Sequence, residues 1–193
     1  MNLIQKAVCE KYVIGAIDAD NLIMSSAKKG PGFKEYHSIM IGFERMFNWM
    51  ESFAKILRID VYLPPSRCID NPMWNNLWEK CRKEFFLNYV YCPKKKPKSL
   101  WEKKDNVDAH LIEKTEEIAK NYNGKFHYFC LASGDRDYSP LLWQLKREAD
   151  VEIAFAIGSE SSFSKTYRQT GIVARHPINN EELVHYFSTR KDI

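Results

Sequence analysis

Residues 131–140 of this chain read LASGDRDYSP, and this segment is the starting point for predicting the fold. An apolar run over residues 126–132 ends in Ser-Gly and two aspartates. Ser139-Pro140 then has the pattern of a helix N-cap followed by the first helical residue. The sequence therefore predicts a strand, a tight turn that carries Asp135 and Asp137, and a helix.

The two aspartates of this turn have two interpretations. In an α/β sheet, ligands bind at the carboxyl ends of the strands, so paired carboxylates there are candidates for a metal site. Alternatively, one aspartate caps the helix and the other is solvated. We favour the metal site, because Ser139 already supplies the cap and leaves both acids without a structural role.

The composition indicates one globular domain over residues 1–193, because 193 residues form one substantial core but leave little room for a second domain. The net charge of +4 is too small to identify a partner. Charges interrupt every long apolar pattern, and no apolar signal core precedes the first strand, so we expect a soluble cytoplasmic protein with no membrane partner. Five widely spaced cysteines without a CxxC pair favour reduced, mostly buried thiols over disulfides or zinc.

The other elements follow from hydrophobic periodicity. The nearly continuous apolar run over 12–18 predicts a central strand that ends in Asp18 and Asp20. Further strands are predicted over 58–63, 87–92, 151–157 and 171–174, and helices over 35–57, from 72 through 81, and over 105–122, 141–149, 158–162 and 180–187. Because strands alternate with helices, we expect a three-layer α/β/α sandwich with a central, mostly parallel sheet.

A lysine-rich segment lies between the strand over 87–92 and the helix over 105–122. Residues 93–104 read PKKKPKSLWEKK. Ammonium groups such as those of Lys95 and Lys96 neutralise phosphates, and an indole such as that of Trp101 stacks on bases, so the segment fits a nucleic-acid groove. A solvated loop is at least as common an explanation for a run of charges.

Carboxylates also follow the strand over 12–18 and begin the helix over 105–122. Asp108 extends the core-facing stripe of that helix, where a carboxylate needs a cation or hydrogen-bond donors. An equally good explanation is that Asp105 caps the helix, while Asp108 is stabilised by the positive N-terminal end of the helix. If the strands of Asp18 and Asp135 are neighbours, the acids converge, and oxygen ligands without histidine or thiolate favour Mg²⁺ or Mn²⁺. Such an ion can activate water against a phosphodiester.

Three segments together resemble the NYN domain family, the PIN-like ribonucleases that include LabA-like proteins. They are IDADNL at 17–22, KDNVDAHL at 104–111 and LASGDRDYSPL at 131–141, and the similarity spans roughly residues 12–170. The resemblance implies an α/β/α sandwich whose acidic pocket binds Mg²⁺ or Mn²⁺ and cleaves RNA. It assigns metal binding and catalysis to Asp18, Asp108, Asp135 and Asp137. It makes Asn21 and Ser133 polar supports for substrate or carboxylate.

One position departs from the family pattern. Family members often carry a further aspartate six residues after the one that matches Asp108, and this chain has Lys114 there. Glu113 is adjacent but points elsewhere on a helix, by about 100° per residue. Lys114 is therefore a candidate phosphate ligand, or a substitute for the cation that leaves the site weak or inactive.

We expect a metal-dependent endoribonuclease acting on single-stranded or structured RNA. The alternative is an RNA-binding or regulatory adaptor with the same fold and little or no turnover. A HAD-like phosphatase is a weaker rival, because Asp18-Ala19-Asp20 imitates its Asp-x-Asp motif but Asn21 and Leu22 follow where that family has Thr or Val nearby. The sequence leaves open whether the chain forms a homodimer.

Overall fold

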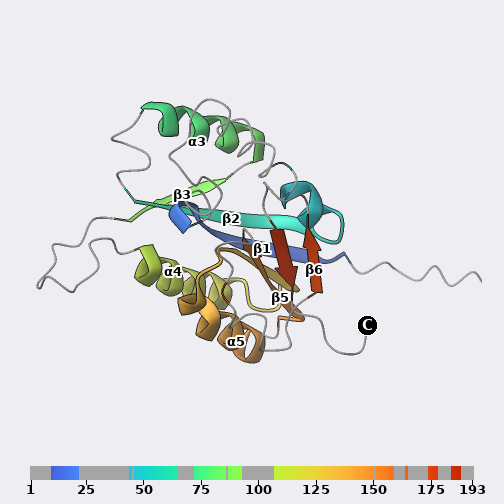
Figure 1. The fold of residues 1–193 in the computed structure, drawn as a ribbon. Coiled ribbons are helices and arrows are strands. Elements are labelled where there is room, and N and C mark those ends of the chain that lie inside the picture. The colour runs from blue at the N-terminus through green and yellow to red at the C-terminus, as the bar shows by residue number, and fades with distance from the viewer. Residues whose placement is uncertain are drawn as a thin grey trace, which may run out of the picture.

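The chain folds into a seven-stranded sheet with helices on both faces (Figure 1). The computed structural model describes residues 10–21, 44, 46–64, 72–85, 87–92, 107–149, 151–158, 164, 174–177 and 184–187. Its elements are β1 (Tyr12–Asp18), β2 (Lys55–Leu63), α3 (Pro72–Phe85), β3 (Asn88–Tyr91), α4 (Val107–Asn121), β4 (Tyr128–Ala132), the 3₁₀ helix η2 (Arg136–Tyr138), α5 (Ser139–Glu148), β5 (Ile153–Gly158), β6 (Ala174–Pro177) and β7 (Val184–Phe187). Residues 46–51 are also helical.

The strand order is β3-β2-β1-β4-β5-β7-β6. The first five strands are parallel, whereas β7 pairs antiparallel with both β5 and β6. β1 lies in the middle of the parallel part, between β2 and β4. This confirms the predicted three-layer α/β/α architecture with a mostly parallel sheet, and it places the strands before Asp18 and Asp135 side by side.

Alternate residues of β1 face two separate cores. Val13 and Ile17 pack in a core with α3 and the helical residues 46–50 on one face. Ile14 and Ala16 pack on the other face in a core with α4 and α5. Figure 1 shows this division, with α3 on one side of the sheet and α4 and α5 on the other. Since side chains alternate along a strand, Asp18 belongs to the face of α4 and α5.

Three predicted helices are wrong in part. The helix predicted over 35–57 ends earlier, because a turn at residues 52–54 leads into β2 at Lys55. The helix predicted over 180–187 is wrong at its end, since Val184–Phe187 is strand β7, whose backbone pairs with β5 and β6. Residues 35–43 and 180–183 lie outside the described part of the chain, as do residues 171–173 of the strand predicted over 171–174. The helix predicted over 158–162 is wrong at Gly158, which is the last residue of β5, and its other residues lie outside the described part.

A β-bulge in β2 explains why its first half did not read as a strand. Val13 pairs with Ile56, but Ile14 pairs with Arg58, so Leu57 has no partner in β1. Leu57 is 38% exposed. Ile56 and Ile59 both pack toward the α3 face although they are three residues apart, because the extra residue reverses the alternation.

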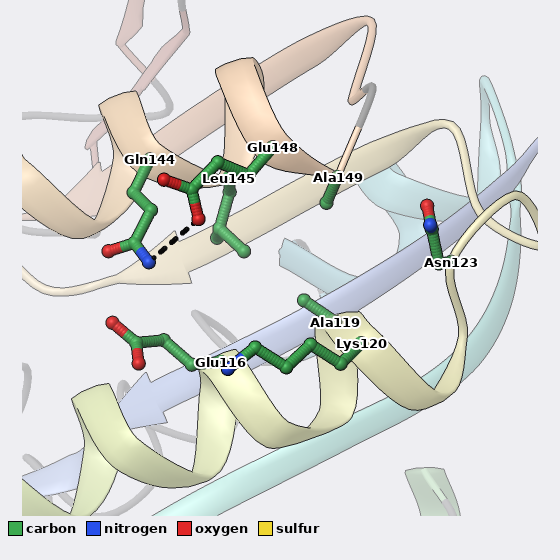
Figure 2. Close-up of a pocket in the computed structure, with 8 residues that line it drawn as sticks. All are labelled: Glu116, Ala119, Lys120, Asn123, Gln144, Leu145, Glu148 and Ala149. Carbon is green, nitrogen blue, oxygen red and sulfur yellow. Dashed lines mark hydrogen bonds between the residues drawn. The ribbon is translucent and has the colours of Figure 1, made fainter.

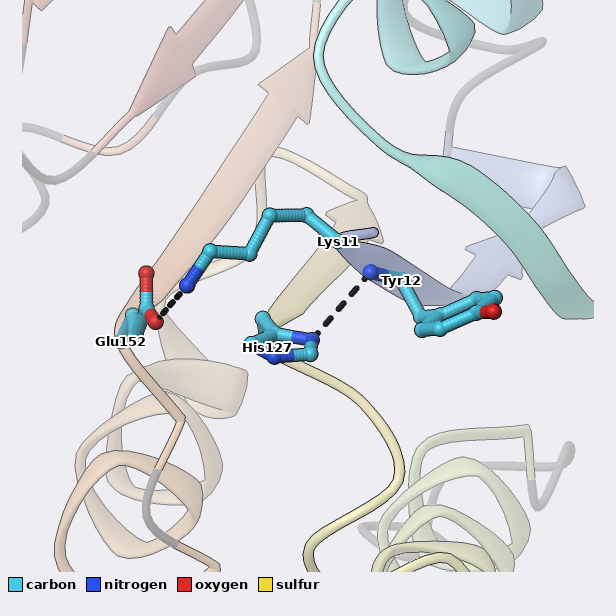
Figure 3. Close-up of polar contacts among 4 residues, drawn as sticks. All are labelled: Lys11, Tyr12, His127 and Glu152. Carbon is cyan, nitrogen blue, oxygen red and sulfur yellow. Dashed lines mark hydrogen bonds and ion pairs between the residues drawn. The ribbon is translucent and has the colours of Figure 1, made fainter. Parts of the chain in front are cut away.

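The amino ends of the parallel strands are tied together at the edge opposite to Asp18 (Figure 3). Tyr12 donates its backbone N–H to His127 Nδ1 at 3.2 Å, and Lys11 forms an ion pair with Glu152. The backbone N–H of His127 also donates to the backbone carbonyl oxygen of Tyr12 at 2.9 Å. These contacts hold the start of β1 against the segments that lead into β4 and β5.

Three further observations concern the cysteines, the end of α4 and the length of the helices in the described part of the chain. The thiols of Cys81, Cys92 and Cys130 are buried, as predicted, whereas Cys9 and Cys68 lie outside the described residues. Gly124, just beyond α4, has φ of 73°, as expected for a helix C-terminal signal. Within the described ranges, no helix is long and apolar enough to cross a bilayer.

Candidate functional site

Two of the predicted acids meet at the carboxyl edge of the sheet. Asp18 is the last residue of β1 and is only 4% exposed, and Asp108 lies in the first turn of α4. Tyr138, the last residue of η2, is completely buried between them. Its hydroxyl oxygen lies 3.0 Å from Asp18 Oδ2 and 2.7 Å from Asp108 Oδ1. One phenol therefore connects a strand end and a helix start that are 90 residues apart in sequence.

Two further groups orient the Asp18 carboxylate. The backbone N–H of Asn21 donates to Asp18 Oδ1 at 3.1 Å, and the Ser133 hydroxyl donates to Asp18 Oδ2 at 3.4 Å. Ser133 is completely buried and also accepts the N–H of Asp135 at 3.2 Å. Asn21 Oδ1 accepts the N–H of Gly134 at 3.0 Å. Asn21 and Ser133 thus support the carboxylate, and Asn21 joins the helical residues 19–21 after β1 to the turn that follows β4.

The electrostatics of this site disfavour ionised Asp18. The pKa of Asp18 is raised from its ordinary value of 3.8 to about 6, mainly by burial and to a smaller extent by the charges of Asp108 and Asp20. The Asn21 N–H and the Tyr138 hydroxyl lower the pKa of Asp18 but do not compensate for burial. Burial and the charges of both acids raise the pKa of Tyr138 strongly, so the phenol stays protonated and acts as a donor.

One acid of the turn, Asp135, has a structural role, which corrects the expectation that Ser139 supplies the cap and leaves both acids without one. Asp135 is the N-cap of η2, because its side chain accepts the N–H of Asp137 at 3.1 Å. Ser139 is not the N-cap of α5. It has helical dihedral angles, and the N-cap position belongs to Tyr138, which makes no side-chain cap hydrogen bond. Asp137 is about half exposed and lies 3.8 Å from the Arg136 guanidinium.

Lys114 does not join the acids. Its side chain is 47% exposed, and Nζ donates to Glu117 Oε2 at 2.7 Å. Within the described part of the chain it makes no ion pair with Asp108. Six residues of an α-helix rotate a side chain by about 240°, so Lys114 and Asp108 project from different sides of α4. Lys114 neutralises Glu117 rather than occupying a cation position beside Asp108.

The predicted RNA-binding residues Lys95, Lys96 and Trp101 lie outside the described residues. The ends of their segment are described. Cys92 is buried and donates its N–H to Leu63 O at 2.9 Å, and Val107, at the other end, is buried one residue before Asp108. The described residues on either side of the lysine-rich segment, Cys92 and Val107, are therefore fixed at the carboxyl edge of the sheet.

The donor set of this site suits a hard divalent cation. Asp18 and Asp108 offer carboxylate oxygens and repel each other, and a cation relieves that repulsion. Within the described ranges, no three or more acid, histidine or cysteine side chains are grouped to hold a metal ion. Mg²⁺ commonly keeps several waters and takes only one or two carboxylates, so the pair alone is a sufficient protein contribution.

A separate groove of about 230 Å³ lies between α4 and α5 (Figure 2). Glu116 and Lys120 of α4 face Gln144 and Glu148 of α5 across it, and Gln144 Nε2 donates to Glu148 Oε2 at 3.0 Å. This groove is at the far end of α4 from Asp108. We therefore do not take this groove as the candidate site, because that site is defined by the convergence of Asp18 and Asp108.

Sequence reasoning missed Tyr138. The residue lies in the segment 131–141 that carries the family resemblance, but the sequence analysis gives it no role. A signal was available, because an aromatic residue with a hydroxyl three residues after Asp135 can be buried and still donate to acids. Its two acceptors became visible only when the fold placed α4 against η2.

Comparisons with known proteins agree on the fold. The NYN domain model matches residues 14–172. A crystal structure of a protein of unknown function, VPA0982 from Vibrio parahaemolyticus RIMD 2210633, superposes with a TM-score of 0.67 at 14% sequence identity, covering 90% of this chain and 96% of that one. At this identity the likeness concerns the fold alone. No curated protein matches the chain.

Proposed function

Because the chain belongs to the NYN domain family of PIN-like nucleases, we propose that it is a metal-dependent endoribonuclease. The observation that carries the proposal is the convergence of Asp18 and Asp108 on one buried hydroxyl. Two carboxylates held so close at a sheet edge destabilise each other unless a cation or a proton compensates their charge. That arrangement is costly for a purely structural site.

In this proposal Asp18 and Asp108 would bind Mg²⁺ or Mn²⁺ directly. Asp135 and Asp137, which follow β4, would contact the hydrated ion and orient the attacking water. When bound, the ion would activate that water and stabilise the leaving oxygen of the phosphodiester. Asn21 and Ser133 keep the Asp18 carboxylate in its orientation, which supports a preorganised site.

The lysine-rich segment is the proposed RNA contact. Lys95 and Lys96 would neutralise backbone phosphates, and Trp101 would stack on a base. The fixed positions of Cys92 and Val107 support this role, because they tether the segment at the edge where the acids converge. We propose single-stranded RNA as the first substrate to test, since stacking requires accessible bases.

The test is cleavage of labelled single-stranded RNA by the purified chain with Mn²⁺, with Mg²⁺ and with EDTA. We expect cleavage only with a metal ion, and a loss of at least about 100-fold in Asp108→Asn and in Asp135→Asn. Asn is as good an N-cap as Asp, so Asp135→Asn preserves η2 while it removes the charge. Full activity of these variants would refute the proposal.

Glu113→Gln is the matched control, because Glu113 is an exposed acid on the same helix as Asp108. Its cleavage rate should equal that of the wild type.

One observation favours the adaptor as a second candidate, namely that the described residues contain no group of three metal-binding side chains. RNA binding without cleavage under any metal condition would support the adaptor.

A further inference from the structure

Tyr138 contacts both proposed metal ligands, although its own side chain has no carboxylate with which to bind the ion. Its oxygen is within 3.0 Å of Asp18 Oδ2 and 2.7 Å of Asp108 Oδ1, and its side chain is completely buried. The ring packs in the core formed with α4 and α5, so the position of the hydroxyl is fixed by the fold. The two acids come from different elements, and this hydroxyl is their shared contact.

We infer that Tyr138 is a positioning residue that holds Asp18 and Asp108 at a separation suited to a single small divalent ion. This inference rests on the proposed metal site. Asp18 is oriented by three donors, two of them outside η2, and its place at the end of β1 is fixed. Asp108 is half-buried in the first turn of α4, and among the described contacts the Tyr138 hydroxyl is the one that links it to Asp18.

The Tyr138 hydroxyl has one more carboxylate beside it than a buried phenol requires. A buried phenol needs one acceptor, because its hydroxyl carries a single hydrogen. Tyr138 has two charged acceptors within hydrogen-bonding distance and can donate to only one at a time. A second carboxylate at this distance adds repulsion without a second hydrogen bond. The arrangement is explained if the pair is preorganised for a cation that neutralises both.

The chain offers a matched control in Tyr62. Tyr62 is also completely buried, packs in the same core, and pairs with Asp18 across β1 and β2. Its hydroxyl makes no hydrogen bond within the described part of the chain. Tyr138→Phe and Tyr62→Phe therefore remove the same buried atom near the same strand end, but only the first removes a contact with the acids.

The experiment is Mn²⁺ binding by the full chain, measured by isothermal titration calorimetry and by the electron paramagnetic resonance signal of free Mn²⁺. Removing a group that orients metal ligands typically costs about 10- to 100-fold in affinity, so we expect Tyr138→Phe to weaken binding at least tenfold. Tyr62→Phe should bind within about twofold of the wild type. RNA cleavage at saturating Mn²⁺ provides a second readout.

A rescue variant separates positioning from general damage to the core. Tyr138→4-aminophenylalanine keeps the shape of the ring and supplies two N–H donors, one for each carboxylate, so its affinity should return to within about threefold of the wild type. This variant also serves if Tyr138→Phe does not fold. Unchanged or tighter binding in Tyr138→Phe, or a folded amino variant that binds as weakly as Tyr138→Phe, would overturn the inference alone. Absence of Mn²⁺ binding by the wild type would overturn both this inference and the proposed metal site.

Discussion

The backbone N–H of Gly134 donates to Asn21 Oδ1 at 3.0 Å, and this bond joins the helical residues 19–21 after β1 to the turn after β4. Asn21 also donates its own N–H to Asp18. A single side-chain amide therefore connects the two segments that carry most of the candidate site. The connection is local to the carboxyl edge and does not involve the contacts at the amino ends of the strands.

Asn21→Ala should destabilise the fold by about 1–2 kcal/mol, because the Gly134 N–H loses its acceptor in a partly buried place. The free energy of unfolding in urea, measured with EDTA present, gives the change. Asn123→Ala is the control, since Asn123 is exposed beyond the end of α4. Equal stability of both variants would show that the Asn21 bond contributes nothing.

The raised pKa of Asp18 predicts a pH dependence of stability. An acid whose pKa rises from 3.8 to about 6 on folding binds its proton more tightly in the folded state. Its contribution to stability is therefore complete below pH 4 and is lost as the pH rises through 6. At about 1.4 kcal/mol per unit, the loss at pH 7 is about 3 kcal/mol at most.

Asp18→Asn isolates this contribution, because it removes the titrating group and keeps the side chain shape. The stability of Asp18→Asn relative to the wild type should increase by about 2 kcal/mol between pH 4 and pH 7. Urea unfolding in EDTA at several pH values measures the difference, in which groups that titrate equally in both chains cancel. A difference that does not vary with pH would contradict the assignment.

Asp135 and Asp137 should differ in their effect on stability. Asp135→Ala removes the N-cap of η2 and should cost about 1 kcal/mol. Asp137→Ala changes an exposed side chain and should cost no more than about 0.5 kcal/mol. Thermal unfolding of the two variants in EDTA gives the comparison. A larger loss in Asp137→Ala would mean that its carboxylate stabilises the fold more than its exposure indicates.

Lys114→Ala should leave both Mn²⁺ affinity and RNA cleavage within about twofold of the wild type, because the ammonium pairs with Glu117 on the exposed side of α4. The variant Glu117→Gln removes the other member of the pair and should behave in the same way. A marked gain of cleavage in Lys114→Ala would instead restore the interpretation in which Lys114 suppresses the metal site.

The sequence was sufficient for features that depend on local patterns. β1 was predicted with its observed bounds, because a fully buried strand is apolar on both faces. The expected convergence of Asp18 and Asp135 was conditional on their strands being neighbours, and β1 does pair with β4. In contrast, residues 184–187 were predicted as the end of a helix over 180–187, and only pairing with β5 and β6 makes them a strand.

The details of the site depended on contacts between distant segments. The 3₁₀ helix η2 moves the start of α5 and makes Asp135 rather than Ser139 the capping residue, a change that no spacing rule predicts. Tyr138 acquires its partners from β1 and α4, which lie 120 and 30 residues away in sequence. Residue type indicated which acids were of interest, whereas tertiary packing determined which of them share a contact.

The bulge at Leu57 bears on how this chain can vary in length. Leu57 is unpaired in β1 and partly exposed, and it separates Ile56 from Arg58 and Ile59. Its deletion would leave Ile56, Arg58 and Ile59 in regular alternation, with both isoleucines still directed toward the α3 core. Position 57 is thus a point where evolution can remove a residue without disturbing the register that carries Asp18 to the sheet edge. Homologues with a shorter β2 should carry their gap there.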